Sequence, residues 1–213
     1  MLGILVIALA MFVLYRQLRS LEASGAAMAA VTLAPHRNSA RLAQMTTYAD
    51  RLFAEKKWLA AEKAYLAVLK VDHKNVTAYS HLGIIYSTQK NMPDAIECFE
   101  IAARLHPSGT TLQNLGLAFF DNHNYIKSIA AFEKAIMFEP TAQRYVGLSR
   151  AHRKLSNLPA SVDALEKAAA LDPTARILET LAEAYEEAGL KDKAIATRRR
   201  QSAPSAAPHT VAS

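Results

Sequence analysis

The side chains that most often carry catalysis or metal binding are present in this chain, but they are scattered. Its seven histidines fall in different segments, and none belongs to an HExxH run or another spacing that would bring metal ligands together. The chain has no glycine-rich phosphate loop and no serine in a nucleophile-elbow sequence. We therefore expect no enzyme activity, no metal site, no cofactor and no small-molecule substrate.

Three further features suggest chemistry, but each has a plainer explanation. Cys98 is the single cysteine, which excludes an intramolecular disulfide. It lies next to Phe99, and we expect it on a partly exposed helix face with a structural role. The triplet Asn-Val-Thr at 75–77 matches a glycosylation sequon, which is common by chance. The three arginines at 198–200 could touch acidic lipid or nucleic acid, but we expect them to complement the dipole of a helix end.

The composition allows a packed core and does not require a polyanionic partner. The chain has 213 residues, of which 51% are hydrophobic, and a formal net charge of +6. That length suits one domain of ordinary size with a short appendage. The basic residues are spread along the chain rather than gathered in one block, so we expect no nucleic-acid partner.

The first fifteen residues form an uncharged apolar run that suits a membrane anchor. Residues 1–15 contain no charged side chain and no proline, and Arg16 and Arg19 follow directly. As a helix the run would cover about 22 Å, short of a hydrocarbon core of about 30 Å. Tyr15 and the two arginines can extend its reach to the interface. We predict a single transmembrane helix with a basic flank over residues 1–19.

The alternative is a cleaved signal peptide, which would place the rest of the chain in the periplasm or outside the cell. No basic segment precedes the apolar run and two arginines follow it, so we favour an uncleaved anchor. Because the positive charge lies on the carboxyl side of the span, the positive-inside rule places everything after Arg16 in the cytoplasm. We interpret residues 20–41 as a spacer and residues 202–213, rich in Pro, Ser and Ala, as a disordered tail.

Between the spacer and the tail, small residues recur at a nearly constant interval. One small position is occupied by Ala49, Gly83, Gly116, Ser149 and Ala182, and a second by Ala61, Ala95, Ser128, Ser161 and Ala194. The first step is 34 residues and the next three are 33. Apolar residues three and four apart place one apolar face on each helix. The pattern predicts five helical hairpins, in residues 42–75, 76–108, 109–141, 142–174 and 175–201.

The turns inside these hairpins carry residues that can end a helix. Asn91, Asn124 and Asn157 stand at the same place in three units, and Gly189 stands one position earlier in the last. We expect these residues to adopt the left-handed conformation. His152 occupies an aromatic position of the pattern, and we expect its ring to be packed and hydrogen-bonded.

The segment from Leu82 to Pro107 carries the pattern most completely. It reads Leu82-Gly83, Tyr86, Ala95-Ile96, Phe99, Ala102, Leu105 and Pro107. It resembles the tetratricopeptide repeat, a helix-turn-helix of about 34 residues. The resemblance covers residues 42 to about 201 and implies an all-α fold, a right-handed superhelix (α-solenoid) of about five repeats. In the last repeat Arg198 and Gln201 replace apolar positions, which suits the polar end cap that a stacked array needs.

The resemblance also implies where a partner would bind. Proteins of this family bind other proteins on a concave face lined by the first helix of each repeat, where polar groups can pair with a peptide backbone. In repeats two and three the matching positions hold hydroxyls, amides and one aromatic ring: Thr77, Ser80, Ser87, Thr110, Gln113, Asn114 and Phe120. Repeat four adds Arg150, Arg153 and Lys154, and repeat five adds Glu179, Glu183, Glu186 and Glu187.

Two expectations follow for this surface. A partner segment should lie across Gln113 and Asn114, with Phe120 as an apolar contact. The basic side chains of repeat four and the acidic side chains of repeat five should pair with each other rather than form a charge-reading pocket.

These observations predict a membrane-anchored scaffold or adaptor that binds a protein or peptide partner. Its role would be in the assembly, secretion or biogenesis of a membrane-associated complex. The alternative is a soluble periplasmic or secreted assembly factor with the same repeats.

Overall fold

The computed structural model describes residues 39–202, which are helical apart from short turns. The chain divides into two compact units between His73 and Lys74. The expected anchor at residues 1–19, most of the expected spacer and the tail from residue 203 lie outside the described residues. Within residues 39–202, no helix is both long and apolar enough to cross a membrane.

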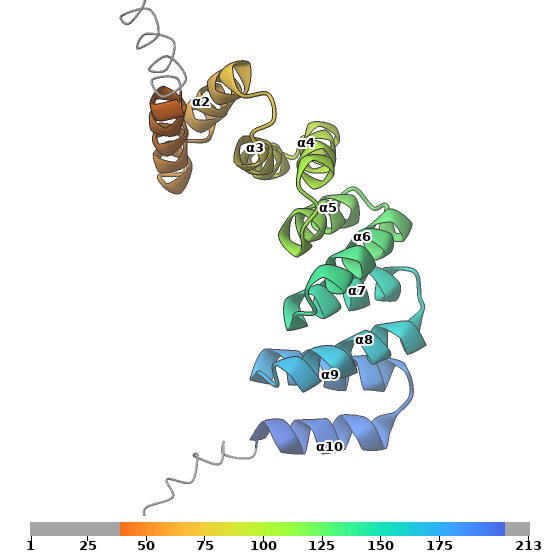
Figure 1. Ribbon diagram of the computed structural model, residues 1–213. Helices are drawn as coiled ribbons and strands as arrows, with labels where there is room; N and C mark the ends of the chain where they lie inside the picture. Colours follow the sequence, from red (N-terminus) through yellow and green to blue (C-terminus); the bar gives the residue numbers. More distant parts are fainter. Residues whose placement is uncertain (1–38, 203–213) are drawn as a thin grey trace, which may run out of the picture. The chain divides into compact units, whose positions relative to one another are not determined.

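The first unit contains one helical hairpin. It consists of a helix at residues 39–54 and α2 (Trp58–Val71), both visible in Figure 1. Tyr65 is fully buried, and its hydroxyl donates a 2.7 Å hydrogen bond to Asp50. Burial, together with the Asp50 carboxylate, raises the pKa of Tyr65, so its hydroxyl stays protonated. Phe53 contacts Trp58 edge-on with ring centroids 5.5 Å apart, and these contacts close the hairpin at its turn.

The second unit contains four more hairpins. Their helices are α3 (Val76–Thr88), α4 (Met92–Leu105), α5 (Gly109–Asp121), α6 (Tyr125–Phe138), α7 (Ala142–Lys154), α8 (Leu158–Leu171), α9 (Ala175–Glu187) and α10 (Lys191–Ser202). The first helices begin at residues 76, 109, 142 and 175, so each start lies 33 residues after the previous one. The all-α fold of consecutive hairpins predicted from the sequence is confirmed for the described residues.

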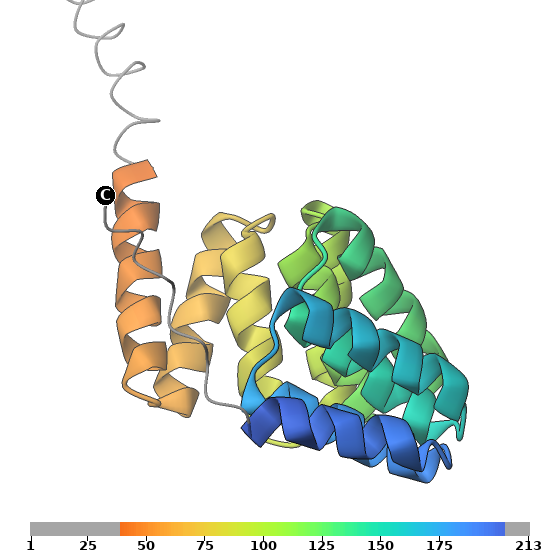
Figure 2. The same ribbon diagram turned by 90° about the horizontal axis from the view of Figure 1, so that it is seen from below.

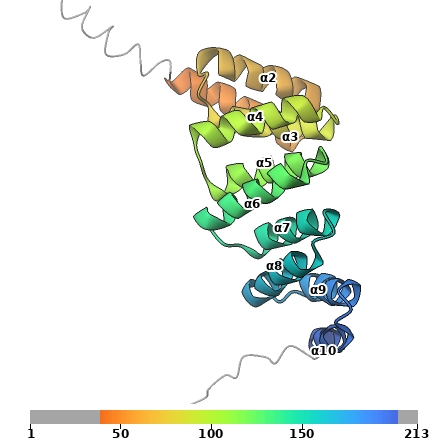
Figure 3. The ribbon, with the colours of Figure 1, turned by 90° about the vertical axis from the view of Figure 1, so that its right-hand side faces the viewer.

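Within the second unit each helix packs against the one that follows it in the chain. Figures 2 and 3 show this order from two further sides. The first helices α3, α5 and α7 also contact one another in sequence order. We call α3, α5, α7 and α9 the first-helix layer.

Glycine allows the close helix approaches that the sequence predicted. A β-carbon added at Gly83 would lie 2.7 Å from the ring of Phe99 on the other helix of its hairpin. At Gly116 the corresponding distance to Phe132 is 3.2 Å. Gly147, which the sequence did not single out, is tighter still, because its β-carbon would lie 2.5 Å from Phe132 of the preceding hairpin. Phe132 therefore fills the junction between two repeats.

Serine at the small positions adds hydrogen bonds to this packing. Ser128 is fully buried and donates a 2.8 Å hydrogen bond to the carbonyl of Gly116. In the next hairpin the hydroxyls of Ser149 and Ser161 lie 2.8 Å apart, and both residues are buried. Each buried hydroxyl thus has a partner on the facing helix, as buried polar groups require.

The structure corrects the expected role of the turn asparagines. Within residues 39–202, the residues with a left-handed backbone are Lys56, Lys90, His123, Ser156 and Gly189, with φ between 56° and 77°. Only Gly189 was predicted. The asparagines come one residue later and begin the second helices, where Asn124 accepts a 3.2 Å hydrogen bond from the backbone N–H of Lys127. An N-cap needs a non-helical backbone and a short polar acceptor, which asparagine supplies.

Two further expectations about single residues need correction. His152 is half-buried, and its buried Nδ1 atom has no hydrogen-bond partner within the described part of the chain, so the expected hydrogen bond is absent at that nitrogen. Cys98 is buried rather than partly exposed, because Ala95, Cys98 and Ala102 share the packed face of α4. Desolvation, with smaller effects from nearby carboxylates, raises the pKa of the Cys98 thiol to about 11. The thiol is therefore a poor nucleophile at neutral pH.

Candidate functional site

Two of the predicted binding residues line a small pocket between α3, α4 and α5. Ser87 and Asn114 contribute a hydroxyl and an amide to a cavity of about 270 Å³. Its other lining residues are Ile84, Thr88, Phe99, Leu117, Ala118 and Asp121. We call this cavity the amide pocket. It combines hydrogen-bonding groups with apolar walls, as a surface that binds a peptide requires.

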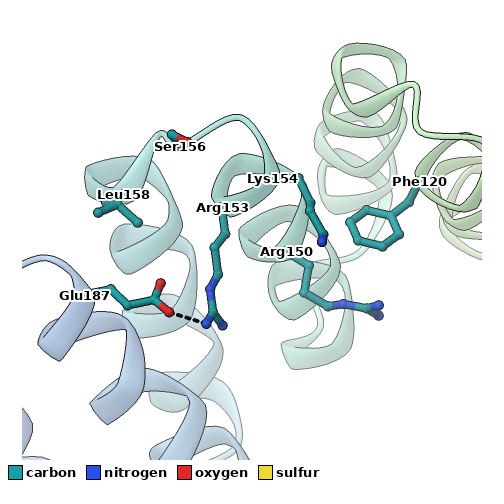
Figure 4. A pocket seen from close by; sticks show the side chains of 7 residues that line it. All are labelled: Phe120, Arg150, Arg153, Lys154, Ser156, Leu158 and Glu187. Atoms are coloured by element: carbon teal, nitrogen blue, oxygen red, sulfur yellow. Dashed lines mark hydrogen bonds and ion pairs between the residues drawn. The ribbon is translucent and has the colours of Figure 1, made fainter.

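Four other predicted residues line a larger pocket of about 660 Å³. They are Phe120 from α5 and Arg150, Arg153 and Lys154 from α7 (Figure 4). Ser156, Leu158 and Glu187 complete the lining, from the turn after α7, from α8 and from α9. We call this cavity the basic pocket. The sequence did not indicate Ser156 or Leu158, because they come from the turn after α7 and from α8, outside the first helices on which the binding surface was expected.

The aromatic wall of the basic pocket is held in place from two sides. The guanidinium carbon of Arg150 lies 4.6 Å from the centroid of the Phe120 ring, a cation–π contact. Tyr125 meets the same ring edge-on, with centroids 5.5 Å apart. Phe120 is half-buried, so part of the ring still faces the pocket.

The expected pairing between repeats four and five is confirmed for one pair. Arg153 donates to Glu187 across the basic pocket, as the dashed line in Figure 4 marks. Two other acidic side chains of α9 pair with α10 instead: Arg198 of α10 contacts Glu186 and, at 3.6 Å, Glu179. Exposed pairs of this kind contribute little to stability.

Gln113 is engaged inside the protein. Its Oε1 accepts a 3.2 Å hydrogen bond from Nε of Arg144, a residue that is only 4% exposed. Arg144 also reaches Glu139, with 2.9 Å between Nη1 and Oε2. Its guanidinium lies against Gly109, where a β-carbon would come within 2.6 Å of it. The Oε1 atom of Gln113 therefore orients a buried arginine.

Arg144 was missed at the sequence level. A lone arginine at the start of a helix usually indicates a solvated side chain. The one available signal was Gly109, which leaves room for the guanidinium at the start of the neighbouring helix.

The remaining predicted residues lie apart from both pockets. Thr77 and Thr110 are exposed in the first turns of α3 and α5, and Ser80 is half-buried on α3. None of the three lines the amide pocket or the basic pocket. In residues 39–202 no group of three His, Cys, Asp or Glu side chains is placed to hold a metal ion.

The repeat pattern is also recognised by comparison with known proteins. A family model described as "Tetratricopeptide repeat" matches residues 48–110 and 146–207, together more than half of the chain, and a second model with the same description matches residues 110–141. No curated protein sequence matches the chain.

Several solved structures share the fold. A crystal structure of MamA is 27% identical, with a TM-score of 0.67, over 72% of this chain and 91% of that one. MamA from Desulfovibrio magneticus RS-1 is 15% identical, with a TM-score of 0.69, over 75% of this chain and 92% of that one. YrrB, described as a TPR protein with an unusual peptide-binding site, is 17% identical, with a TM-score of 0.63, over 74% of this chain and 82% of that one.

Proposed function

This chain belongs to the tetratricopeptide repeat family, and on that premise we propose that it is a scaffold for other proteins. A segment of the partner binds along the first-helix layer, across α3, α5 and α7. The observation that carries the proposal is that both pockets reach the same end of α5. Leu117 and Asp121 line the amide pocket, and Phe120 lines the basic pocket. One extended segment can therefore occupy both.

The chemistry of the two pockets supports this mode of binding. Ser87 and Asn114 offer groups that can pair with a peptide backbone, and Phe120 offers a half-buried aromatic surface. Aromatic anchors in pockets contribute a large share of the energy of many protein interfaces. The likeness to YrrB adds support from the fold alone.

Site-specific photocrosslinking tests the proposal directly. A photoreactive phenylalanine analogue would replace Ser87 in the amide pocket or, as a control, Lys134, which is exposed on α6. We expect irradiation in cells to give a discrete crosslinked partner from position 87 and none from position 134. Crosslinks from position 134 alone would place the binding surface on the second helices and contradict the proposal.

We further propose that residues 1–15 anchor the scaffold in a membrane, with the repeats in the cytoplasm, where it serves assembly, secretion or biogenesis of a membrane-associated complex. The uncharged run and the arginines that follow it support this proposal. A reporter that is active only after export, fused after Ser213, should be silent, and the protein should stay in membranes washed with carbonate. An active exported reporter and a mature chain that lacks the first residues would favour the periplasmic alternative.

A further inference from the structure

We infer that the basic pocket binds an acidic segment of the partner, in which two carboxylate side chains flank an apolar one, and that Glu187 occupies part of this site in the free protein. The inference rests on the proposed function and specifies the partner's chemistry. Three cations and one carboxylate line the pocket, which leaves an excess of two positive charges (3 − 1 = 2). Two partner carboxylates would balance that excess.

The positive charge is particular to α7. One repeat of 33 residues earlier, the positions of Arg153 and Lys154 hold Phe120 and Asp121, and one repeat before that they hold Ser87 and Thr88. Cations in the last turn of α7 also complement its dipole. That explanation does not cover Arg150, which lies a turn earlier and is directed at Phe120 rather than at the helix end.

The arginines keep donors available for a ligand. The guanidinium carbon of Arg150 lies 4.6 Å from the centroid of the Phe120 ring, and an arginine held against an aromatic ring can still bind a carboxylate through its N–H groups. Phe120 and Leu158 supply apolar walls for the side chain between the two acids. A volume of about 660 Å³ falls within the range of sites that enclose a ligand of several groups.

Glu187 acts as an internal competitor in this arrangement. Its carboxylate pairs with Arg153, yet 39% of the Glu187 side chain and 42% of the Arg153 side chain remain exposed. An exposed pair is weak, so a partner carboxylate can replace it at small cost. Removing the Glu187 charge should therefore strengthen binding, whereas removing the cations should weaken it.

Fluorescence anisotropy with synthetic peptides and the full chain tests the inference. The probe is a dye-labelled peptide, Ser-Gly-Glu-Leu-Glu-Gly-Ser, whose amidated carboxyl end leaves only side-chain carboxylates. A control peptide has Gln in place of both Glu residues. A third peptide, the Gln version with a free carboxyl end, shows whether a terminal carboxylate is sufficient. The protein variants are Arg153→Gln with Lys154→Gln, Glu187→Gln, and a control that removes two exposed cations elsewhere, Lys70→Gln with Lys134→Gln.

We expect the Glu peptide to bind and both Gln peptides to bind about tenfold more weakly. A tenfold difference corresponds to the loss of about one charge-assisted hydrogen bond. The variant Arg153→Gln with Lys154→Gln should bind the Glu peptide roughly tenfold more weakly than the wild type does. Added salt should weaken the binding of the Glu peptide to the wild type. Glu187→Gln should bind it about threefold more tightly, as expected for release of an exposed pair. The two-lysine control should match the wild type, and circular dichroism should show equal helicity throughout.

Equal binding of the Glu and Gln peptides would overturn the inference, as would unchanged or weaker binding by Glu187→Gln. If a terminal carboxylate alone bound as well as the Glu peptide, the assignment to an internal acidic segment would fall. Crosslinking from position 87 separates the outcomes. If it persists while the acidic peptide fails to bind, the scaffold function stands and only the acidic ligand is wrong.

Discussion

Two residues after the end of each first helix stands a residue whose backbone is left-handed, and in four of the five turns that residue carries a side chain. Lys90 has φ 65°, and Gly189 is the one glycine at this position, with φ 77°. A left-handed backbone costs an L-residue roughly 1–2 kcal/mol, and glycine avoids this at a smaller entropic cost. Four of the five turns therefore store strain at the same place in the repeat.

Introducing glycine at this position should stabilise the protein, and removing glycine from it should destabilise the protein. We expect Lys90→Gly to raise the free energy of unfolding by about 0.5–1 kcal/mol, because the strain disappears. Gly189→Ala should lower the free energy of unfolding by about 1 kcal/mol. No neighbouring atom lies within 4 Å of the added β-carbon, so the loss comes from the left-handed backbone alone. Urea unfolding followed by circular dichroism measures both. A loss of stability in Lys90→Gly would mean that the lysine side chain contributes more than its backbone costs.

Glycine at the helix contacts leads to a second prediction at this scale. An added β-carbon would lie 2.5 Å from Phe132 at Gly147 but 3.2 Å away at Gly116. Phe132 is 1% exposed, so its ring has little free space into which to move. We expect Gly147→Ala to cost about 1–3 kcal/mol and Gly116→Ala clearly less. Thermal unfolding would rank the two variants, and equal losses would show that the junction adjusts to either.

At the scale of helices, the α7–α8 hairpin is joined by one buried pair of hydroxyls. Ser149 and Ser161 are 2% and 1% exposed, and their oxygens lie 2.8 Å apart. Ser149→Ala alone should cost about 1–3 kcal/mol, because it leaves a buried hydroxyl without its partner. Replacing both serines by alanine should be nearly neutral.

A double-mutant cycle measured by chemical unfolding checks this coupling. The two single variants should lose more stability in sum than the double variant loses. Additive losses would show that the hydroxyls do not depend on each other.

The order of the helices could be predicted from the sequence because the small residues recur at a fixed interval. Gly83, Gly116 and Ser149 occupy one register, and a helix pair can pack closely only where its side chains are small. The turns were less predictable. Asparagine favours both a left-handed helix end and an N-cap, and the sequence alone does not separate the two roles when Lys90 precedes Asn91.

The candidate site was predictable in its residues but not in their partners. Phe120, Arg150, Arg153 and Lys154 were expected on one surface, and the structure brings them to one pocket. Gln113 was expected on the same surface, and the sequence did not predict that its Oε1 would accept a hydrogen bond from Arg144 of the next repeat. Side-chain contacts between repeats depend on distances that a repeat pattern does not contain.

At the scale of the whole molecule, the repeats build a surface, and within residues 39–202 no group of three His, Cys, Asp or Glu side chains is placed to hold a metal ion. The amide pocket and the basic pocket lie on neighbouring parts of that surface, near the carboxyl end of α5. Their chemistry differs, since one offers neutral hydrogen-bonding groups and the other positive charge. If the proposed ligand is correct, a partner that fills both presents an exposed backbone at one end and acidic groups at the other, and this combination would favour it over other proteins.

The most direct test of the scaffold function is quantitative capture of the partner by variants of this surface. The full chain would be isolated from cells as the wild type, as Asn114→Ala with Phe120→Ala, and as Lys134→Ala, and bound proteins would be quantified by mass spectrometry. Truncation of an anchor typically costs about 2 kcal/mol, or roughly a 30-fold loss of affinity. We predict that the double variant loses the partner while its helicity is unchanged, and that Lys134→Ala keeps it. Full capture by the double variant, with loss in Lys134→Ala, would contradict binding on the first-helix layer.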